Sequence, residues 1–183
     1  MGALGYCRYS VEKWGEQGCD RPTCWFAGRV PDDPSSFKVT EVAFHFGAPE
    51  KVAYVCRLLR KAVSAGAKVI VLADAEMVQL IDAELWALSP VDFIGHCGGT
   101  ANSTMKEISS VVLITEIQQA FANRQVLVNL TESVPEEFDT FDRLIEVVSV
   151  DEADRNHARR RWKVYADRGY SIARHDLTLR GAS

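Results

Sequence analysis

The stretch KVIVLA, residues 68–73, constrains the fold most, because after its lysine the run is apolar without interruption. A strand with one solvent-facing side alternates polar and apolar residues. A run without alternation indicates a strand that is buried on both faces, as in a parallel sheet. The sequence therefore predicts a sheet with covering layers on both sides.

Strand-like and helix-like segments alternate along the rest of the chain, and this alternation is typical of an α/β domain. We predict a Rossmann-like single domain with a mostly parallel sheet flanked by helices. The predicted strands are 41–46, 68–73, 92–97, 109–115, 124–130 and 145–150, and the predicted helices are 50–66, 74–88, 136–144 and a basic helix from about Asp151.

Residues 1–38 differ from the remainder, because Gly, Pro, Ser and single aromatics follow one another there with no period of two or 3.6. We interpret them as an irregular N-terminal extension, flexible or the product of a wrongly assigned start codon, ahead of an α/β domain at 39–183. Cys19 and Cys24 form a C-x4-C pair without a second pair or a histidine at zinc-site spacing, so no metal site is expected. Five cysteines without framework spacing indicate a reducing compartment, and the absence of a signal peptide predicts a cytoplasmic protein.

Motifs for nucleotide binding and catalysis are missing from the sequence. GAPEK follows the first predicted strand where a dinucleotide-binding domain has G-x-G-x-x-G, and no G-x-x-x-x-G-K-[ST] occurs. His96 and Cys97 are adjacent in a predicted strand, so their side chains point to opposite faces and make a poor dyad. We predict no catalytic residues and no cofactor, and keep a small nucleotide-binding α/β enzyme as a disfavoured alternative.

The charges separate along the C-terminal third. Residues 132–154 contain nine acids and one base, whereas residues 155–180 contain eight bases and two acids. A basic helix is most often a solvated face, and acids in its first turn favour the positive end of the helix dipole. At about 100° per residue, Ala158 and Tyr165 share one arc, Arg155, Arg159 and Lys163 share another, and Trp162 lies between them. This arrangement predicts a shallow apolar notch rimmed by cations, suited to a carboxylate-ended peptide.

Four stretches together resemble the chi subunit family of bacterial DNA polymerase III: VAFHF, DAELWALSPVDFIGHC, VLVNL with EVVS, and ARRRWKVYADRGYSIARHDL. The resemblance extends from about Thr40 to Leu177. It implies a non-catalytic accessory subunit of a DNA-directed DNA polymerase, a nucleotidyltransferase complex. In the family this subunit links the clamp loader, through the psi subunit, to the acidic, Phe-ended C-terminal tail of single-stranded DNA-binding protein. Nucleic acid would then be contacted only indirectly, and direct DNA binding through the basic helix is a second alternative.

The resemblance also implies two partner sites. The tail-binding residues correspond to Arg155, Arg159, Trp162 and Lys163, with an apolar wall at Val148 or Val150. The family commonly has Tyr or Phe at the position of Trp162. The psi-facing residues correspond to Trp86, Phe93, Ile94 and His96, although Trp86 and Phe93 have a core position as their alternative interpretation.

Overall fold

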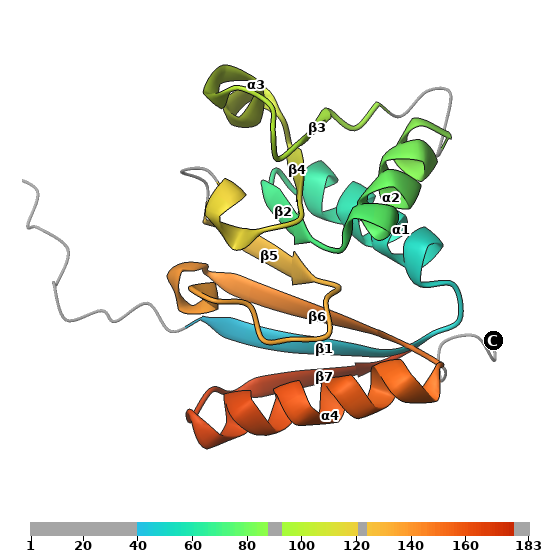
Figure 1. Cartoon of the computed structure of the whole chain (residues 1–183), viewed down its shortest axis with the longest axis vertical. Coiled ribbons are helices and arrows are strands. Elements are labelled where there is room, and N and C mark those ends of the chain that lie inside the picture. The colour runs from blue at the N-terminus through green and yellow to red at the C-terminus, as the bar shows by residue number, and fades with distance from the viewer. Residues whose placement is uncertain (1–39, 88–92, 121–123, 178–183) are drawn as a thin grey trace, which may run out of the picture. The chain divides into compact units, whose positions relative to one another are not determined.

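The computed structural model describes residues 40–87, 93–120 and 124–177, which belong to one compact unit, Lys38–Ser183. The predicted extension 1–38, with its C-x4-C pair, lies outside the described residues. Seven strands form one sheet, and every neighbouring pair is parallel, which confirms the predicted α/β class (Figure 1). The order is β3-β4-β2-β5-β6-β1-β7. The strands are β1 Glu41–Ala48, β2 Val69–Leu72, β3 His96–Gly98, β4 Val111–Ile114, β5 Val126–Asn129, β6 Arg143–Ser149 and β7 Ile172–Asp176.

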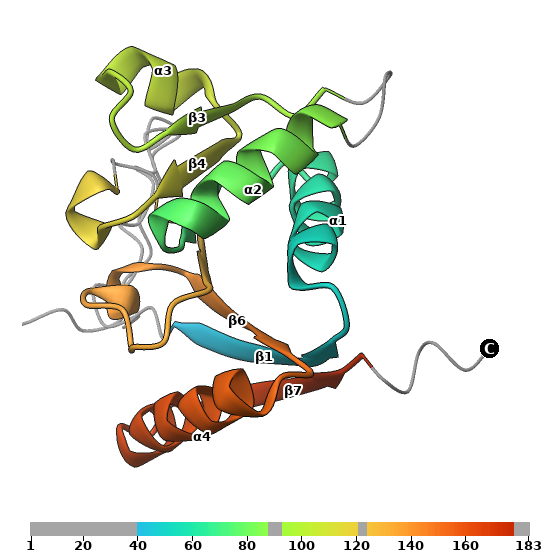
Figure 2. The ribbon, with the colours of Figure 1, turned by 45° about the vertical axis from the view of Figure 1, so that its right-hand side comes forward.

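Helices cover both faces of this sheet. α1 and α2 lie on one face, and α4 lies against the other face at the end of the sheet formed by β1 and β7 (Figures 1 and 2). The α-helices are α1 Lys51–Ser64, α2 Ala75–Ala87, α3 Ser103–Ile108 and α4 Glu152–Asp167, and the short 3-10 turns are η1 Ile117–Gln119 and η2 Phe138–Thr140.

Local sequence signals set the helix boundaries. Asp74 Oδ1 accepts a hydrogen bond of 2.8 Å from the backbone N–H of Met77, and Asp74 thereby caps the start of α2. Asp151 caps α4 in the same way, by accepting from the backbone N–H groups of Ala153 and Asp154. Gly66, just after α1, has a φ of 79°, a left-handed conformation that glycine adopts without a steric penalty.

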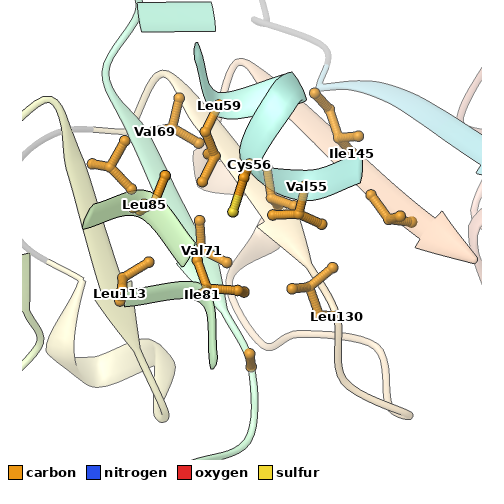
Figure 3. Packing of buried hydrophobic residues seen from close by; sticks show 14 of the residues in the cluster. Val55, Cys56, Leu59, Val69, Val71, Ile81, Leu85, Leu113, Leu130 and Ile145 are labelled. Atoms are coloured by element: carbon orange, nitrogen blue, oxygen red, sulfur yellow. The ribbon is translucent and has the colours of Figure 1, made fainter. Parts of the chain in front are cut away.

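The apolar run at β2 contributes to both sides of the core. Val69 and Val71 pack in a cluster with α1 and α2, whereas Ile70 and Leu72 pack in a second cluster on the α4 side. Figure 3 shows the first cluster, where side chains of α1 and α2 meet those of β2 and its neighbours. Burial, with Glu84 acting in the same direction, raises the pKa of the Cys56 thiol in this cluster to about 11, so Cys56 is a packing residue.

One predicted helix is wrong, and two elements of the structure were not predicted. The predicted helix over 136–144 is wrong: Glu137 has a φ of 54°, η2 follows it, and the chain enters β6 at Arg143. The apolar side chains of that segment are three residues apart, at Phe138 and Phe141, and one short turn is enough to bury both. Strand β7 and helix α3 were not predicted, since β7 is a short edge strand with little apolar patterning.

Candidate functional site

A hollow of about 540 Å³ opens where β1, β6 and β7 end and α4 begins. The carboxyl ends of parallel strands meet at one edge of a sheet, and α/β folds place ligand sites there. The volume is within the range of sites that hold small molecules or short peptide ends. The hollow is lined by Phe46, Gly47, Ser149, Val150, Arg155, Arg159, Trp162, Arg174 and Asp176.

An irregularity in β1 shapes one wall of this hollow. The pairing of β1 with β6 shifts register between His45 and Ala48. Gly47 within that shift has a φ of 77°, a left-handed conformation that side chains disfavour. Such bulges bend a strand and redirect its side chains, and here the bulge lies directly at the hollow.

Aromatic side chains form the apolar part of the hollow. The indole of Trp162 lies 4.9 Å from the ring of Phe44 and 6.0 Å from that of Phe46, measured between centroids. The guanidinium of Arg174 lies 5.5 Å from the centroid of Phe46, in a cation–π contact. Trp162 is therefore half-buried against β1 and keeps part of its surface at the hollow, which can hold an apolar side chain.

Two exposed arginines of α4 provide positive charge at the same place. Arg155 Nη1 lies 3.4 Å from Glu152 Oε2, and Arg159 Nη1 lies 3.0 Å from Glu152 Oε1. Arg159 also donates to Asn156 Oδ1 at 2.6 Å. Arg155 lies one turn and Arg159 about two turns from the start of α4, so both guanidinium groups lie on the side of the helix that lines the hollow.

An ion pair behind the hollow fixes the turn between β6 and α4. Asp154 Oδ2 accepts from the backbone N–H of Ser149 at 2.8 Å and from Lys51 Nζ at 3.0 Å. Burial alone would raise the pKa of Asp154, but the hydrogen bond from Ser149 and the charge of Lys51 lower it below its ordinary value. The ionised Asp154 thus ties α1, β6 and α4 together at the rim of the hollow.

Under α4 lies a buried polar cluster, which we define as Glu146, Arg161, Tyr165 and Asn129. Glu146 accepts from Arg161 Nε at 2.9 Å, from the Tyr165 hydroxyl at 2.7 Å and from Asn129 Nδ2 at 3.0 Å. Arg161 Nη1 also donates to the backbone oxygen of Glu132 at 3.1 Å. The cluster joins α4 to β5, β6 and the loop after β5, and so fixes the rotation of α4 on the sheet.

The pKa values in this cluster follow from its burial. Burial raises the pKa of the Glu146 carboxyl, against the lowering effect of Arg161 and of the donors Asn129 and Tyr165. Burial and then the neighbouring Glu146 raise the pKa of the Tyr165 phenol, so Tyr165 keeps its proton and remains a donor.

This cluster was not predicted, although two signals for it were present in the sequence. On the helix wheel Arg161 falls at about 240° from Arg155, on the arc of Ala158 and Tyr165 rather than on the basic arc. Glu146 is the single acid within the apolar strand IEVVSV. A base on the buried face of a helix beside an acid in a buried strand indicates an internal ion pair.

The structure brings together Arg155, Arg159, Trp162 and Val150 from the predicted tail-binding set. The other two members lie elsewhere: Val148 is fully buried in the core and Lys163 is exposed, and neither is among the residues that line the hollow. Arg174 and Asp176 of β7 line the hollow but were not predicted.

A second, apolar surface lies at the end of α2, where the rings of Trp86 and Phe93 are 5.6 Å apart. Trp86 is 62% exposed and Phe93 is 74% exposed, so the alternative that these two are core residues is wrong. The other two residues of the predicted psi-facing set have buried side chains: Ile94 packs in the core, and the His96 side chain is 2% exposed. His96 lies 5.0 Å from the ring of Trp86, its Nδ1 is 2.7 Å from the Ile94 oxygen, and its Nε2 is 3.3 Å from Asp82 Oδ1.

Metal clusters and membrane-spanning helices are both absent from residues 40–87, 93–120 and 124–177. No group of three or more His, Cys, Asp or Glu side chains is placed to hold a metal ion in these ranges. Likewise, none of the helices within them is long and apolar enough to cross a membrane.

One solved structure of similar fold is the C-terminal domain of the DEAD-box protein Dbp5. The TM-score is 0.51, over 77% of this chain and 92% of that one, with 12% sequence identity. At this identity the likeness shows a shared fold and nothing about function.

Sequence comparisons point to one family. The family model of the DNA polymerase III chi subunit, HolC, matches residues 39–173. The DNA polymerase III subunit chi of Pseudomonas aeruginosa is 30% identical over 124 residues, which are 67% of this chain and 83% of that protein. The subunit chi of Haemophilus influenzae is 29% identical over 122 residues, covering 64% of this chain and 81% of that protein. The chain therefore belongs to the DNA polymerase III chi subunit family.

Proposed function

We propose that this chi-family chain is a non-catalytic replication adaptor that holds the acidic, Phe-ended tail of single-stranded DNA-binding protein in the hollow at α4. The observation that carries the proposal is the hollow itself, where half-buried Trp162 lies beside Arg155, Arg159 and Arg174. A peptide end offers an apolar side chain and carboxylates within a few ångströms of each other, and the hollow offers partners for both.

Two alternative functions, a nucleotide-binding enzyme and a direct DNA-binding module, would each need a different sequence or surface feature. A nucleotide-binding enzyme needs a phosphate-binding loop, which the sequence lacks after its first strand. Direct DNA binding needs a long basic surface, whereas the formal net charge of the chain is −4 and Arg161 is buried in an ion pair.

Calorimetry with two synthetic acidic peptides tests the proposal, one ending in Phe and one lacking that residue. Burial of an apolar side chain contributes about 1.5–3 kcal/mol independently of salt. The Phe-ended peptide should therefore bind more tightly than the shortened one at both low and high salt, while the electrostatic part weakens as the Debye length falls from about 10 Å at 0.1 M.

Titration with ATP and with a single-stranded oligonucleotide completes the experiment. Equal affinities for the two peptides would contradict the proposed pocket. Oligonucleotide binding that falls steeply with salt and competes with the peptide would favour DNA binding instead.

We further propose that the Trp86–Phe93 surface binds the psi subunit of the clamp loader. Exposed neighbouring aromatics are uncommon on monomers and frequent at the centres of interfaces. The support is their exposure together with their ring contact at the end of α2.

Co-elution with psi tests this second surface. Trp86→Ala and Phe93→Ala should abolish co-elution and leave peptide binding unchanged. Leu80→Ala is the matched control, because Leu80 is a half-exposed apolar residue of the same helix about 120° around it from Trp86. Retained co-elution of both aromatic variants would remove this surface from the proposal.

A further inference from the structure

We infer that Glu152 is a built-in competitor of the ligand. In the free protein its carboxylate occupies the arginines that a peptide carboxylate contacts in the complex. The inference rests on the proposed peptide-binding function and adds to it a residue that lowers the affinity for simple anions.

The geometry around Glu152 places both of its oxygens on cations of the hollow. Glu152 is in the first turn of α4, three positions before Arg155 and seven before Arg159, so all three side chains share one face of the helix. Each oxygen contacts a different arginine, at 3.4 Å and 3.0 Å. Arg155 and Arg159 line the hollow, and thus two cations that face a ligand are already paired.

Because Glu152 and its two arginines are exposed, a ligand carboxylate can replace Glu152 in the ion pairs. The side chains of Glu152 and Arg159 are 64% and 58% exposed, and that of Arg155 is 50% exposed. Ion pairs at such exposed positions contribute little and break readily. The Glu146–Arg161 pair, in contrast, is almost completely buried and cannot be exchanged for an outside group without uncovering a charge.

This replacement of Glu152 affects which ligands the hollow selects. When a ligand carboxylate replaces Glu152, the contacts of Glu152 with the arginines are lost, so the net electrostatic gain is smaller than it would be at unpaired arginines. A ligand therefore binds tightly only if it adds apolar contact with Trp162. Glu152 in this way reduces the affinity for simple anions and phosphate chains and leaves the apolar contact as the main source of affinity.

Acids in the first turn of a helix also stabilise the helix dipole, and this simpler role has to be separated from competition. The test uses the full chain and a synthetic acidic peptide ending in Phe with a free carboxylate. Glu152→Gln removes the charge and retains the size of the side chain. We expect it to bind the peptide about two- to fivefold more tightly, as expected from releasing a weak exposed ion pair.

Two controls separate competition from a general change in charge. Asp167→Asn removes an exposed acid at the other end of α4 and should leave the peptide affinity unchanged. In an Arg155→Ala/Arg159→Ala background, Glu152→Gln should have no effect, because its partners are gone.

Each outcome decides the inference. Equal or weaker binding by Glu152→Gln, with normal peptide binding by the unsubstituted chain, overturns the inference and leaves the proposed function standing. A gain that persists without the two arginines, or that Asp167→Asn reproduces, also overturns it, since the effect is then one of long-range charge. Failure of the unsubstituted chain to bind the peptide overturns both proposals.

Discussion

The buried polar cluster under α4 and the open hollow beside it are built from the same residue types, but they differ in solvent exposure. Arg161 and Glu146 are almost fully buried and paired with one another, while Arg159 and Glu152, on the same helix as Arg161, are more than half exposed. A buried charge has no water to replace a lost partner, whereas an exposed charge does. The comparison teaches that, in one basic helix, solvent exposure separates the residues that hold the fold from those free to bind a ligand.

The largest expected effect comes from breaking the buried side of this comparison. Arg161→Ala leaves Glu146 buried without its cation and should lower the free energy of unfolding by about 3–5 kcal/mol. Arg160→Ala removes an exposed base next to it and should change that free energy by less than about 0.5 kcal/mol. Urea unfolding of the two variants measures the difference, and similar losses would contradict the contrast drawn between the two regions.

A smaller effect is expected on the exposed side. Arg159→Ala should weaken binding of the Phe-ended acidic peptide by about 1.5–3 kcal/mol, the contribution of a charge-assisted hydrogen bond. Its unfolding free energy should stay close to that of the unsubstituted chain, because the side chain is exposed. Calorimetry and urea unfolding together check both halves of this prediction; unchanged peptide affinity would remove Arg159 from the site.

The Lys51–Asp154 pair lies between the two regions in burial and should have an intermediate role. Asp154→Asn should destabilise the protein by about 1–2 kcal/mol at neutral pH. Because the pKa of Asp154 is lowered in the folded state, its stabilising contribution is complete above the ordinary Asp pKa and is lost as the pH falls through the lowered folded value.

Unfolding measurements on a pH series test this linkage. The difference between Asp154→Asn and the unsubstituted chain should be constant from about pH 7 to pH 5 and shrink under more acidic conditions. If the difference in unfolding free energy grew as the pH fell, the pKa of Asp154 would not be lowered in the folded state, and the prediction would be wrong.

Much of the fold could be predicted from local patterns, for reasons that particular elements illustrate. Residues 69–73 have no polar position, so they indicated a strand with two buried faces, and Asp74, Gly66 and Asp151 stand at helix ends where their own side-chain or backbone chemistry favours a cap. Strand β7 could not be found in this way, because its residues alternate weakly and β1 alone supplies its pairing.

The candidate site also contains residues that local patterns reveal and residues that only the tertiary fold places. The helix wheel placed Trp162 between apolar and basic arcs, since both arcs belong to one continuous helix. The contribution of Arg174 depends on β7 lying beside β1, and such a pairing is decided by the tertiary fold. Arg161 shows the opposite case, because its angle on the helix and the lone acid Glu146 in the strand IEVVSV were both visible in the sequence.

The register of β1 has a consequence for the order in which parts of the protein fold during synthesis. β1 pairs with β6 and β7, so Val42 near its beginning aligns with Leu144 and with Ile172 near the end of the chain. Contacts between residues so distant in sequence form slowly, after most of the chain has been ordered. A ribosome-bound chain that has not yet released β7 lacks one wall of the hollow. We therefore expect the binding site to be among the last parts of the molecule to appear during synthesis.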